Sequence, residues 1–501
     1  MHRFNRRQFL TLSASAAGGV LLSRCTSNQE ATLTSQVVSS QAGLLDVTLT
    51  SSQSRYRIGS QQGVLTTYNE RIPGTRLEAR PGDTVRIRFN NQLPQATNLH
   101  YHGLHIPPTG NADNIFLSVP PNETLEYEFT IPSNHPAGTF YYHPHRHGTV
   151  AEQIFAGLGG IFIVRGGLDE IPEVQAAQEE FLFLKDFALN ANGQIPSPGH
   201  MELMQGREGA ILTVNGQVNP NFSIPTGGLL RLRIVNAAAA RFYRLSLEGH
   251  PLYLIATDGG AIAEPVELQE LLLSPGERAE VLVKGDREPK QYRLLNLPYS
   301  RGGMGMMGNM SGMGMMHDMN GMGDMENASA SQTPQPLATL VYRDAASSIP
   351  LPKQLIPVET LPEPTNIRRI ELSMAMEMEG MESGMNMNGG IGMKFMFNSK
   401  TFDTNRVDAA VKLGTVEEWE LVNSDPDQMD HPFHLHVNPF QIINRNGQPE
   451  PYRAWKDTVI VKGSETVRIR IPFQDFPGKT VYHCHILDHE DLGMMGVVEM
   501  V

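Results

Sequence analysis

The chain has 501 residues, which is too long for one hydrophobic core and suggests about three domains. Its formal net charge of −13 argues against nucleic acid as a partner and mildly favours the attraction of cations. The 47 glycines and 34 prolines punctuate short runs that alternate apolar and polar residues, such as TVRIRFN and TLEYEFTI. Short alternating runs at close spacing predict an all-β protein made of sandwiches or barrels.

Residues 1–28 predict an export signal that is not part of the mature fold. The pair Arg6-Arg7 precedes a run of small and apolar residues that is too short to span a bilayer comfortably. The pattern resembles a twin-arginine signal and predicts a periplasmic or otherwise exported protein with no transmembrane span. Cys25 is a candidate lipid-anchor site, although Arg24 fits a lipoprotein cleavage box poorly; the alternative is a leader cysteine that cleavage removes.

The first and last thirds of the chain repeat the same order of features: a Gly turn, an alternating strand, an Asn, a polar loop and a His-rich strand. Residues 81–105 match 413–436 in this way, and 136–148 match 476–493. The segment 226–260 keeps the frame in the middle third but has no His-x-His. We therefore predict three consecutive sandwiches, with sites on the first and third only. The predicted domains are 44–168, 178–345 and 365–501.

Four His-x-His pairs lie in these outer thirds. Residues i and i+2 of a strand point to the same face, roughly 6.5–7 Å apart, so two imidazoles can converge on one metal or on neighbouring metals. A single pair is more often a surface or core feature. Four pairs in two duplicated domains favour a metal cluster, because eight imidazoles exceed what one ion can use. The pairs are His100/His102, His143/His145, His434/His436 and His483/His485.

Cys484 lies between His483 and His485, so its side chain points to the opposite face of that strand and needs ligands of its own. His489 and Met494 follow across a tight loop, and His431 can approach from the neighbouring strand. Two His, one Cys thiolate and a weak axial Met form a blue-copper set. Zinc could use the same ligands, but it would not explain the histidines on the other face.

These segments resemble the signatures of the multicopper oxidase family in order and spacing, and the resemblance covers the whole mature chain. It implies three cupredoxin-like Greek-key sandwiches that hold four copper ions: one type 1, one type 2 and a coupled type 3 pair. The residues that match the family's ligands are His431, Cys484, His489 and Met494 for type 1, His100 and His434 for type 2, and His102, His143, His145, His436, His483 and His485 for type 3.

The family's reaction is the oxidation of four equivalents of a one-electron donor with reduction of dioxygen to water, which also consumes four protons. Glu490 resembles the acid that feeds protons to the cluster, and Asp113 resembles the acid near the type 2 copper. The alternative for each is a solvated loop acid. Asp457, in WKDTV, matches a position that orients a ligand histidine. His250 matches a structural position of the family, His105 and His147 have no ligand role in it, and His135, His200 and His317 are predicted to lie in loops.

Methionines are concentrated in two stretches. Ten of the 25 lie between Met304 and Met325, and eight lie between Met374 and Met396. Flexible core filling is the ordinary reason for Met-rich stretches, but these are rich in Gly, Asn and Ser, and thioethers suit Cu(I). The pattern resembles periplasmic copper efflux oxidases, which oxidise Cu(I) at a labile extra site. The matching residues are Met374, Asp427, Met429 and Asp491.

Other functions are left open by the sequence. A general laccase would act on small phenols or on Mn(II) or Fe(II), although a Met-rich cover would hinder bulky phenols. A copper-binding or cell-envelope assembly protein on an inactive scaffold would lack ligands, whereas here every ligand position is filled. A nitrite reductase would use two sandwiches in a trimer. We expect a monomer that uses O2 with Cu(I) or a small phenol as donor.

Overall fold

The computed structural model describes residues 36–302, 333–378 and 391–501. Strands dominate it, and the prediction of an all-β fold is confirmed. The predicted leader, the stretch 304–325 and most of the segment 374–396 lie outside the described residues. The short helices are α2 (Val150–Phe155), η1 (Gly167–Glu170), α3 (Pro172–Gln175), α4 (His200–Gln205) and α6 (Leu487–Asp491).

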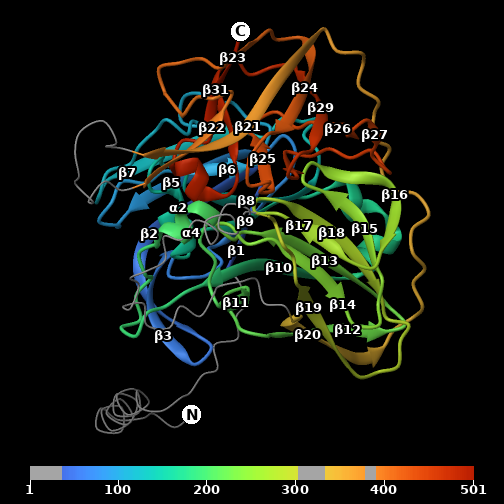
Figure 1. The fold of residues 1–501 in the computed structure, drawn as a ribbon. Helices are drawn as coiled ribbons and strands as arrows, with labels where there is room; N and C mark the ends of the chain where they lie inside the picture. Colours follow the sequence, from blue (N-terminus) through green and yellow to red (C-terminus); the bar gives the residue numbers. More distant parts are fainter. Residues whose placement is uncertain (1–35, 303–332, 379–390) are drawn as a thin grey trace, which may run out of the picture. The chain divides into compact units, whose positions relative to one another are not determined.

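Strands of the first third form two sheets, which we call the first sandwich (Figure 1). Along β5, Val85, Ile87 and Phe89 are buried while their neighbours are more exposed, as the period of two requires. The sheet orders are β3-β2-β5-β7 and β1-β4-β9-β8-β6. The strands are β1 (Val37–Ser39), β2 (Leu44–Ile58), β3 (Gln61–Tyr68), β4 (Arg76–Ala79), β5 (Thr84–Asn91), β6 (His100–His102), β7 (Thr124–Thr130), β8 (Gly138–His143) and β9 (Gly160–Val164).

The middle third forms the second sandwich around a core of its own. Its sheets run in the orders β11-β10-β13-β18-β15-β16 and β12-β20-β19-β14-β17. The strands are β10 (Gln178–Phe187), β11 (Ile211–Val214), β12 (Asn221–Thr226), β13 (Leu229–Asn236), β14 (Tyr243–Leu247), β15 (Leu252–Thr257), β16 (Gly260–Leu268), β17 (Leu271–Leu273), β18 (Arg278–Lys284), β19 (Gln291–Leu297) and β20 (Gln335–Ala345).

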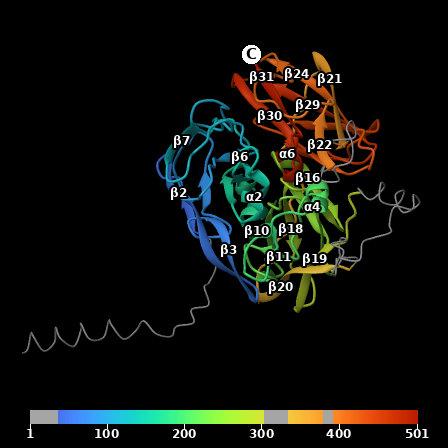
Figure 2. The same cartoon turned by 60° about the vertical axis from the view of Figure 1, so that its left-hand side comes forward.

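The last third forms the third sandwich, drawn in orange and red in Figures 1 and 2. Its sheets run in the orders β22-β21-β24-β29-β26-β27 and β23-β31-β30-β25-β28. The strands are β21 (Asn366–Met378), β22 (Ile391–Phe397), β23 (Ala409–Val411), β24 (Thr415–Asn423), β25 (His431–Leu435), β26 (Gln441–Arg445), β27 (Gln448–Pro449), β28 (Thr458–Val461), β29 (Thr466–Phe473), β30 (Gly478–Cys484) and β31 (Met495–Met500).

Strand register places histidines opposite one another in the same way in the first and third sandwiches. In the first, antiparallel β6 and β8 pair His100 with His143. In the third, antiparallel β25 and β30 pair His434 with His483. Directly opposite residues have Cβ atoms roughly 4.5–5.5 Å apart, so each pairing brings two imidazoles together. At the start of the first sandwich, β1 precedes residue 44 and pairs with β4; the domain bounds stay predictions.

Candidate metal centre

A group of buried side chains surrounds Cys484 within the third sandwich. Nδ1 of His431 lies 3.6 Å from Sγ of Cys484, and Nδ1 of His489 lies 3.8 Å from it. The backbone N–H of Ile486 donates to the same sulfur at 3.5 Å. His431, Cys484 and His489 could hold a metal ion together. Met494 is fully buried in the same hydrophobic core. We call these four residues, His431, Cys484, His489 and Met494, the Cys484 site.

The outer nitrogens of its two histidines are both bonded to oxygens. Nε2–H of His431 donates to Oδ2 of Asp425 at 2.8 Å, and Nε2–H of His489 donates to the carbonyl oxygen of Met204 at 2.9 Å. Each imidazole therefore carries its proton on Nε2 and turns the Nδ1 lone pair toward Cys484. The ring of Phe395 stacks on His489 with centroids 3.8 Å apart, which shields this edge from water.

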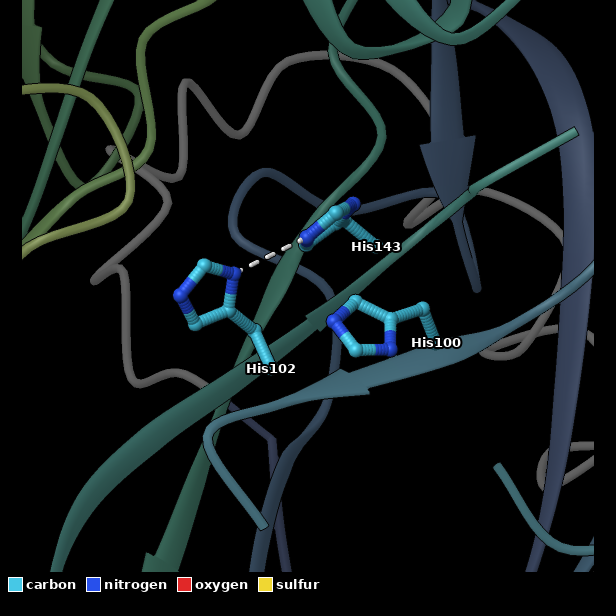
Figure 3. A group of neighbouring side chains, drawn as sticks. All are labelled: His100, His102 and His143. Atoms are coloured by element: carbon cyan, nitrogen blue, oxygen red, sulfur yellow. Dashed lines mark hydrogen bonds between the residues drawn. The ribbon is translucent and has the colours of Figure 1, made fainter. Parts of the chain in front are cut away.

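Eight buried histidines from the first and third sandwiches form a second group, which we call the histidine cluster: His100, His102, His143, His145, His434, His436, His483 and His485. Figure 3 shows three of its members and the close approach between Nδ1 of His102 and Nε2 of His143, at 3.4 Å. Nε2 of His102 lies 3.0 Å from Oδ1 of Asp457, and Nδ1 of His143 lies 2.9 Å from the carbonyl oxygen of Pro144. Both outer nitrogens are donors, so the two facing nitrogens carry lone pairs. Two lone pairs this close need a cation between them.

The same arrangement recurs around His483. Its Nδ1 lies 3.0 Å from the carbonyl oxygen of Cys484, which leaves the Nε2 lone pair pointing inward. Nε2 of His145 lies 3.2 Å from that atom, and Nε2 of His436 lies 3.1 Å from it. Three imidazoles from two sandwiches thus converge on one point, in a group that could hold a metal ion.

His100 and His434 complete the cluster between these groups. Nδ1–H of His100 donates to Oδ1 of Asp113 at 2.8 Å, and Nδ1–H of His434 donates to the carbonyl oxygen of Asp457 at 2.8 Å. Nε2 of each ring is buried and has no hydrogen-bond partner in the described structure. Buried polar atoms are rarely left unpaired, and a bound metal ion would satisfy both. The eighth member, His485, contacts the hydroxyl of Tyr141 at 3.1 Å.

Burial sets the charge state of these groups. It lowers the pKa of His100, His436 and His483 well below the usual histidine value, and that of His143 to about 3. The rings are therefore neutral, which is the form that binds metals. Burial likewise raises the pKa of the Cys484 thiol, so that a cation is needed to hold it as the thiolate.

Comparisons with known proteins agree with this geometry. Family models described as multicopper oxidase match residues 50–168, 183–320 and 374–501. A solved structure, "Multicopper oxidase from Campylobacter jejuni: a metallo-oxidase", is 32% identical and covers 93% of this chain and 94% of its own, with a TM-score of 0.78. The chain belongs to the multicopper oxidase family.

Two curated relatives share most of this multicopper oxidase's length. "Multicopper oxidase mco" of Staphylococcus haemolyticus is 27% identical and covers 86% of this chain and 83% of its own. "Cell division protein FtsP" of Photorhabdus laumondii is 27% identical and covers 98% of both chains. Family membership implies bound copper, and the donor set of thiolate, thioether and neutral imidazoles suits that ion. Family membership does not identify the electron-donating substrate.

Both predicted acids of this multicopper oxidase lie beside the histidine cluster. Oε2 of Glu490 lies 3.1 Å from Nδ1 of His483, and Oε1 lies 3.6 Å from Nδ1 of His145. Burial and the neighbouring charge of Asp491 hold the pKa of Glu490 well above its usual range. Burial raises the pKa of Asp113 to about 8, although Oδ1 accepts the backbone N–H of Tyr101.

The four residues predicted for an extra copper site are not all brought together. Met374 and Met429 are buried in the core that also contains Cys484, and Asp427 is buried two residues from Met429. Asp491 lies elsewhere: its carboxylate accepts backbone N–H groups of Gly148, Val150 and Ala151 at the start of α2. Both oxygens of Asp491 are thus engaged by the first sandwich, and its place in an extra copper site stays a prediction.

Sequence reasoning missed several groups that hold the ligands in this multicopper oxidase. Asp425 and the Met204 carbonyl orient the histidines of the Cys484 site. Arg278 of the second sandwich donates to both oxygens of Asp457 at 2.7 and 2.6 Å, and Gly276 packs against His485 so closely that a Cβ would lie 2.8 Å from the ring. The DPDQMDH run contained the signal for Asp425; the contacts from the second sandwich had none.

Helices in the described ranges 36–302, 333–378 and 391–501 lack the length and apolar character needed to cross a bilayer.

The histidines predicted to have no ligand role are accounted for differently. His250 is satisfied by the Glu248 carbonyl oxygen at 2.7 Å and the Tyr342 hydroxyl at 2.8 Å. His200 begins α4 at the surface. His317 lies outside the described residues.

Proposed function

We propose that this chain is an exported multicopper oxidase that oxidises Cu(I) and reduces O2 to water, with copper detoxification as its role. The Cys484 site would hold the type 1 copper. His100 and His434 would hold the type 2 copper. The type 3 pair would be held by His102, His143, His145, His436, His483 and His485.

One observation carries the assignment of the ligands. In the histidine cluster, each ring that can be assigned donates one N–H outward to an oxygen and turns a lone pair inward. Nδ1 of His102 and Nε2 of His143 face each other at 3.4 Å with no proton between them, and the inward lone pair of His483 faces Nε2 of His145 at 3.2 Å and Nε2 of His436 at 3.1 Å. A histidine network built for structure would alternate donors and acceptors, as His250 does.

When bound, copper ions supply the one-electron storage that lets four donor oxidations be matched to one O2 reduction. The chain supplies the connection between sites, because Cys484 is covalently flanked by two members of the cluster, His483 and His485. It also keeps water from the Cys484 site through Phe395 and the surrounding core.

Protons would come from Glu490 and Asp113. Burial disfavours the charged form of Glu490 and raises its pKa, and its carboxyl group lies beside two imidazoles on the outer side of the cluster. General acids with pKa values near the working pH transfer protons most effectively. Asp113, with a pKa of about 8, meets that condition beside His100.

Cu(I) as the donor is supported by the thioethers near the Cys484 site. Met374 pairs with Phe395 across β21 and β22, and Phe395 covers His489. Met429 precedes His431 by two residues and is buried. Thioethers bind Cu(I) at any ordinary pH because they carry no titrating proton. The Asp427 carboxylate would favour the Cu(II) product, so that the site can release it.

The experiment compares Cu(I) and phenol oxidation in Asp427→Ala, Met429→Leu and their combination. Met→Leu conserves volume and removes only the sulfur. We expect Cu(I) oxidation to fall severely, while small outer-sphere donors that reach the type 1 edge directly are much less affected. Met500→Leu is the matched control, since Met500 is buried in the same core but has no predicted copper role.

The alternative is a general laccase that acts on phenols or on Mn(II) or Fe(II). It is favoured if the ratio of Cu(I) to phenol oxidation rates stays within about twofold of wild type in all variants, the scatter expected of mutational comparisons. Trimming 304–325 separates the two further, since it should weaken Cu(I) capture and improve access for bulky phenols. Export by the twin-arginine route, a monomeric state and a lipid anchor at Cys25 stay predictions.

A further inference from the structure

His105 belongs to the first sandwich but contacts two segments of the third sandwich. One is the turn that follows β25, and the other is the loop that leads into β30. Its Nδ1 lies 2.8 Å from the carbonyl oxygen of Val437, and its Nε2 lies 2.7 Å from Oδ1 of Asp475. Its ring packs against Phe476 with centroids 4.9 Å apart. Val437 directly follows the cluster member His436, and Asp475 and Phe476 precede β30, which carries His483 and Cys484.

Both segments that His105 touches contain strained backbone. Val437 has a φ of 66° and Phe476 a φ of 61°, in the left-handed region that non-glycine residues rarely adopt. For a β-branched residue such as Val437 this conformation is an outlier. The N–H of Asn438 donates to the carbonyl oxygen of His436 at 2.7 Å, so Val437 is the centre of a three-residue turn of the strained kind. Such turns persist only where surrounding contacts hold them.

His105 is itself fixed in place by His135. The backbone N–H of His105 donates to Nε2 of His135 at 3.0 Å, while Nδ1–H of His135 donates to the carbonyl oxygen of Pro136 at 2.8 Å. His135 is 4% exposed, and burial lowers its pKa to about 4, so it is neutral and available as an acceptor. The groups facing the two ring nitrogens of His105 are a carbonyl oxygen and a carboxylate oxygen, both of them acceptors.

We propose that His105 is a positioning residue for the metal centre: it clasps the strained turn after His436, and the entry to β30, onto the first sandwich. This proposal rests on the proposed function for the identity of the metal. His105 ligates no ion in it. Its effect is to keep His436 in register with His145 and His483, which come from two different sandwiches.

The test uses full-length, copper-loaded protein with His105→Ala. We expect copper to leave the histidine cluster roughly tenfold faster during dialysis against a chelator; this is the low end of the 10–100-fold change in metal affinity on losing a direct partner of a ligand, because His105 acts on His436 through the turn. The blue absorbance from the Cys484 site should keep its intensity per chain. In the copper-free protein, the amide of Asn438 should exchange its hydrogen faster, because the turn is no longer held.

Two further variants tie the effect to the clasp. His105→Asn can place an N–H where Nδ1 lies and should keep the slow copper loss. The double variant His105→Ala/Val437→Gly should lose copper more slowly than His105→Ala, because glycine adopts a positive φ without strain. His250→Ala is the matched control, since it removes an imidazole with the same number of hydrogen bonds from the second sandwich.

The proposal is overturned if His105→Ala loses copper within about twofold of the rate of His250→Ala, the scatter of such comparisons. Loss of the blue colour in parallel with cluster copper would also overturn it, since that indicates general unfolding. If the added Val437→Gly does not slow copper loss, then His105 does not act through the strained turn. A wild-type chain that takes up no copper would overturn the proposed function instead, and the exchange rate of Asn438 would still decide whether His105 holds the turn.

Discussion

The Cys484 site and the histidine cluster are built on opposite faces of the same strand, β30, but they depend on the fold differently. All four residues of the Cys484 site come from the third sandwich, and the second sandwich adds the Met204 carbonyl and apolar side chains such as Ala240 and Phe242 to the surrounding core. The histidine cluster draws four residues from the first sandwich and four from the third. One site is internal to a sandwich, whereas the other exists only where two sandwiches meet.

This difference separates two kinds of stability. The Cys484 site lies in a hydrophobic core built mostly by the third sandwich, so we expect it to tolerate disturbance at the boundary with the first sandwich. The histidine cluster depends on polar contacts that cross those boundaries, such as the bond from His102 to Asp457 and the ion pair from Arg278 to the same carboxylate. Changes to either set should therefore affect one site and spare the other.

Cys484→Ser should have the largest effect. The thiolate that gives the blue colour is lost, and turnover should stop because electrons no longer enter. The cluster ligands face the other way, so metal analysis should still find about three of four coppers per chain. Visible absorbance, oxygen uptake and copper content are measured together. A blue, active Cys484→Ser protein contradicts the assignment.

Glu490→Gln should slow oxygen reduction by about 10²–10⁴, the usual contribution of a general acid. The glutamine keeps the shape beside His483 and His145 but carries no transferable proton. Copper content and blue colour should stay, which would show that the effect belongs to the cluster side of β30 alone. Glu499→Gln, on β31, is the control. Equal turnover of Glu490→Gln and wild type across pH 5–8 would show that Glu490 is a bystander.

Asp457→Asn should weaken copper binding in the histidine cluster by about 10–100-fold, the usual effect of losing a partner of a ligand. It removes the negative charge and one of the two acceptor oxygens that serve His102 and Arg278, and it turns an NH2 group toward one of these donors. Copper retained against a chelator is the measurement, with the blue absorbance as internal reference. If cluster copper and blue colour fall together, the two sites are not independent.

Acid should destabilise the copper-free protein through the cluster. The pKa of His143 is about 3 in the folded chain, below its ordinary 6.5, so the unfolded chain binds more protons between these values. The contribution of this residue to the free energy of unfolding is therefore fully present above pH 6.5 and falls by about 1.4 kcal/mol per pH unit below it. Urea unfolding midpoints from pH 7 to 4 measure the slope. His143→Gln should reduce it and Cys484→Ser should not; equal slopes would refute the cause.

The sequence predicted much of the fold because period-two patterning and the repeated His-rich strands are local signals. The His-x-His pairs and the run around Cys484 specified which side chains share a face, and the structure brings those side chains together. Contacts between sandwiches were not predictable, since nothing local in Arg278 or Gly276 indicates that they reach Asp457 and His485. The contacts of the Asp491 carboxylate with the first sandwich were not predictable for the same reason, since its place two residues after His489 gives no sign of them.

The hydrogen bond between His102 and Asp457 joins residues 355 positions apart. Contacts of such long sequence separation are expected to form late, because the entropy cost of closing a large loop comes before the contact can stabilise the chain. The cluster is therefore among the last parts of the molecule to be assembled, and it cannot form on a chain whose C-terminal segment is missing. Copper bound at the cluster would then report that synthesis and folding are complete, and a truncated or misfolded chain would be left without the cluster.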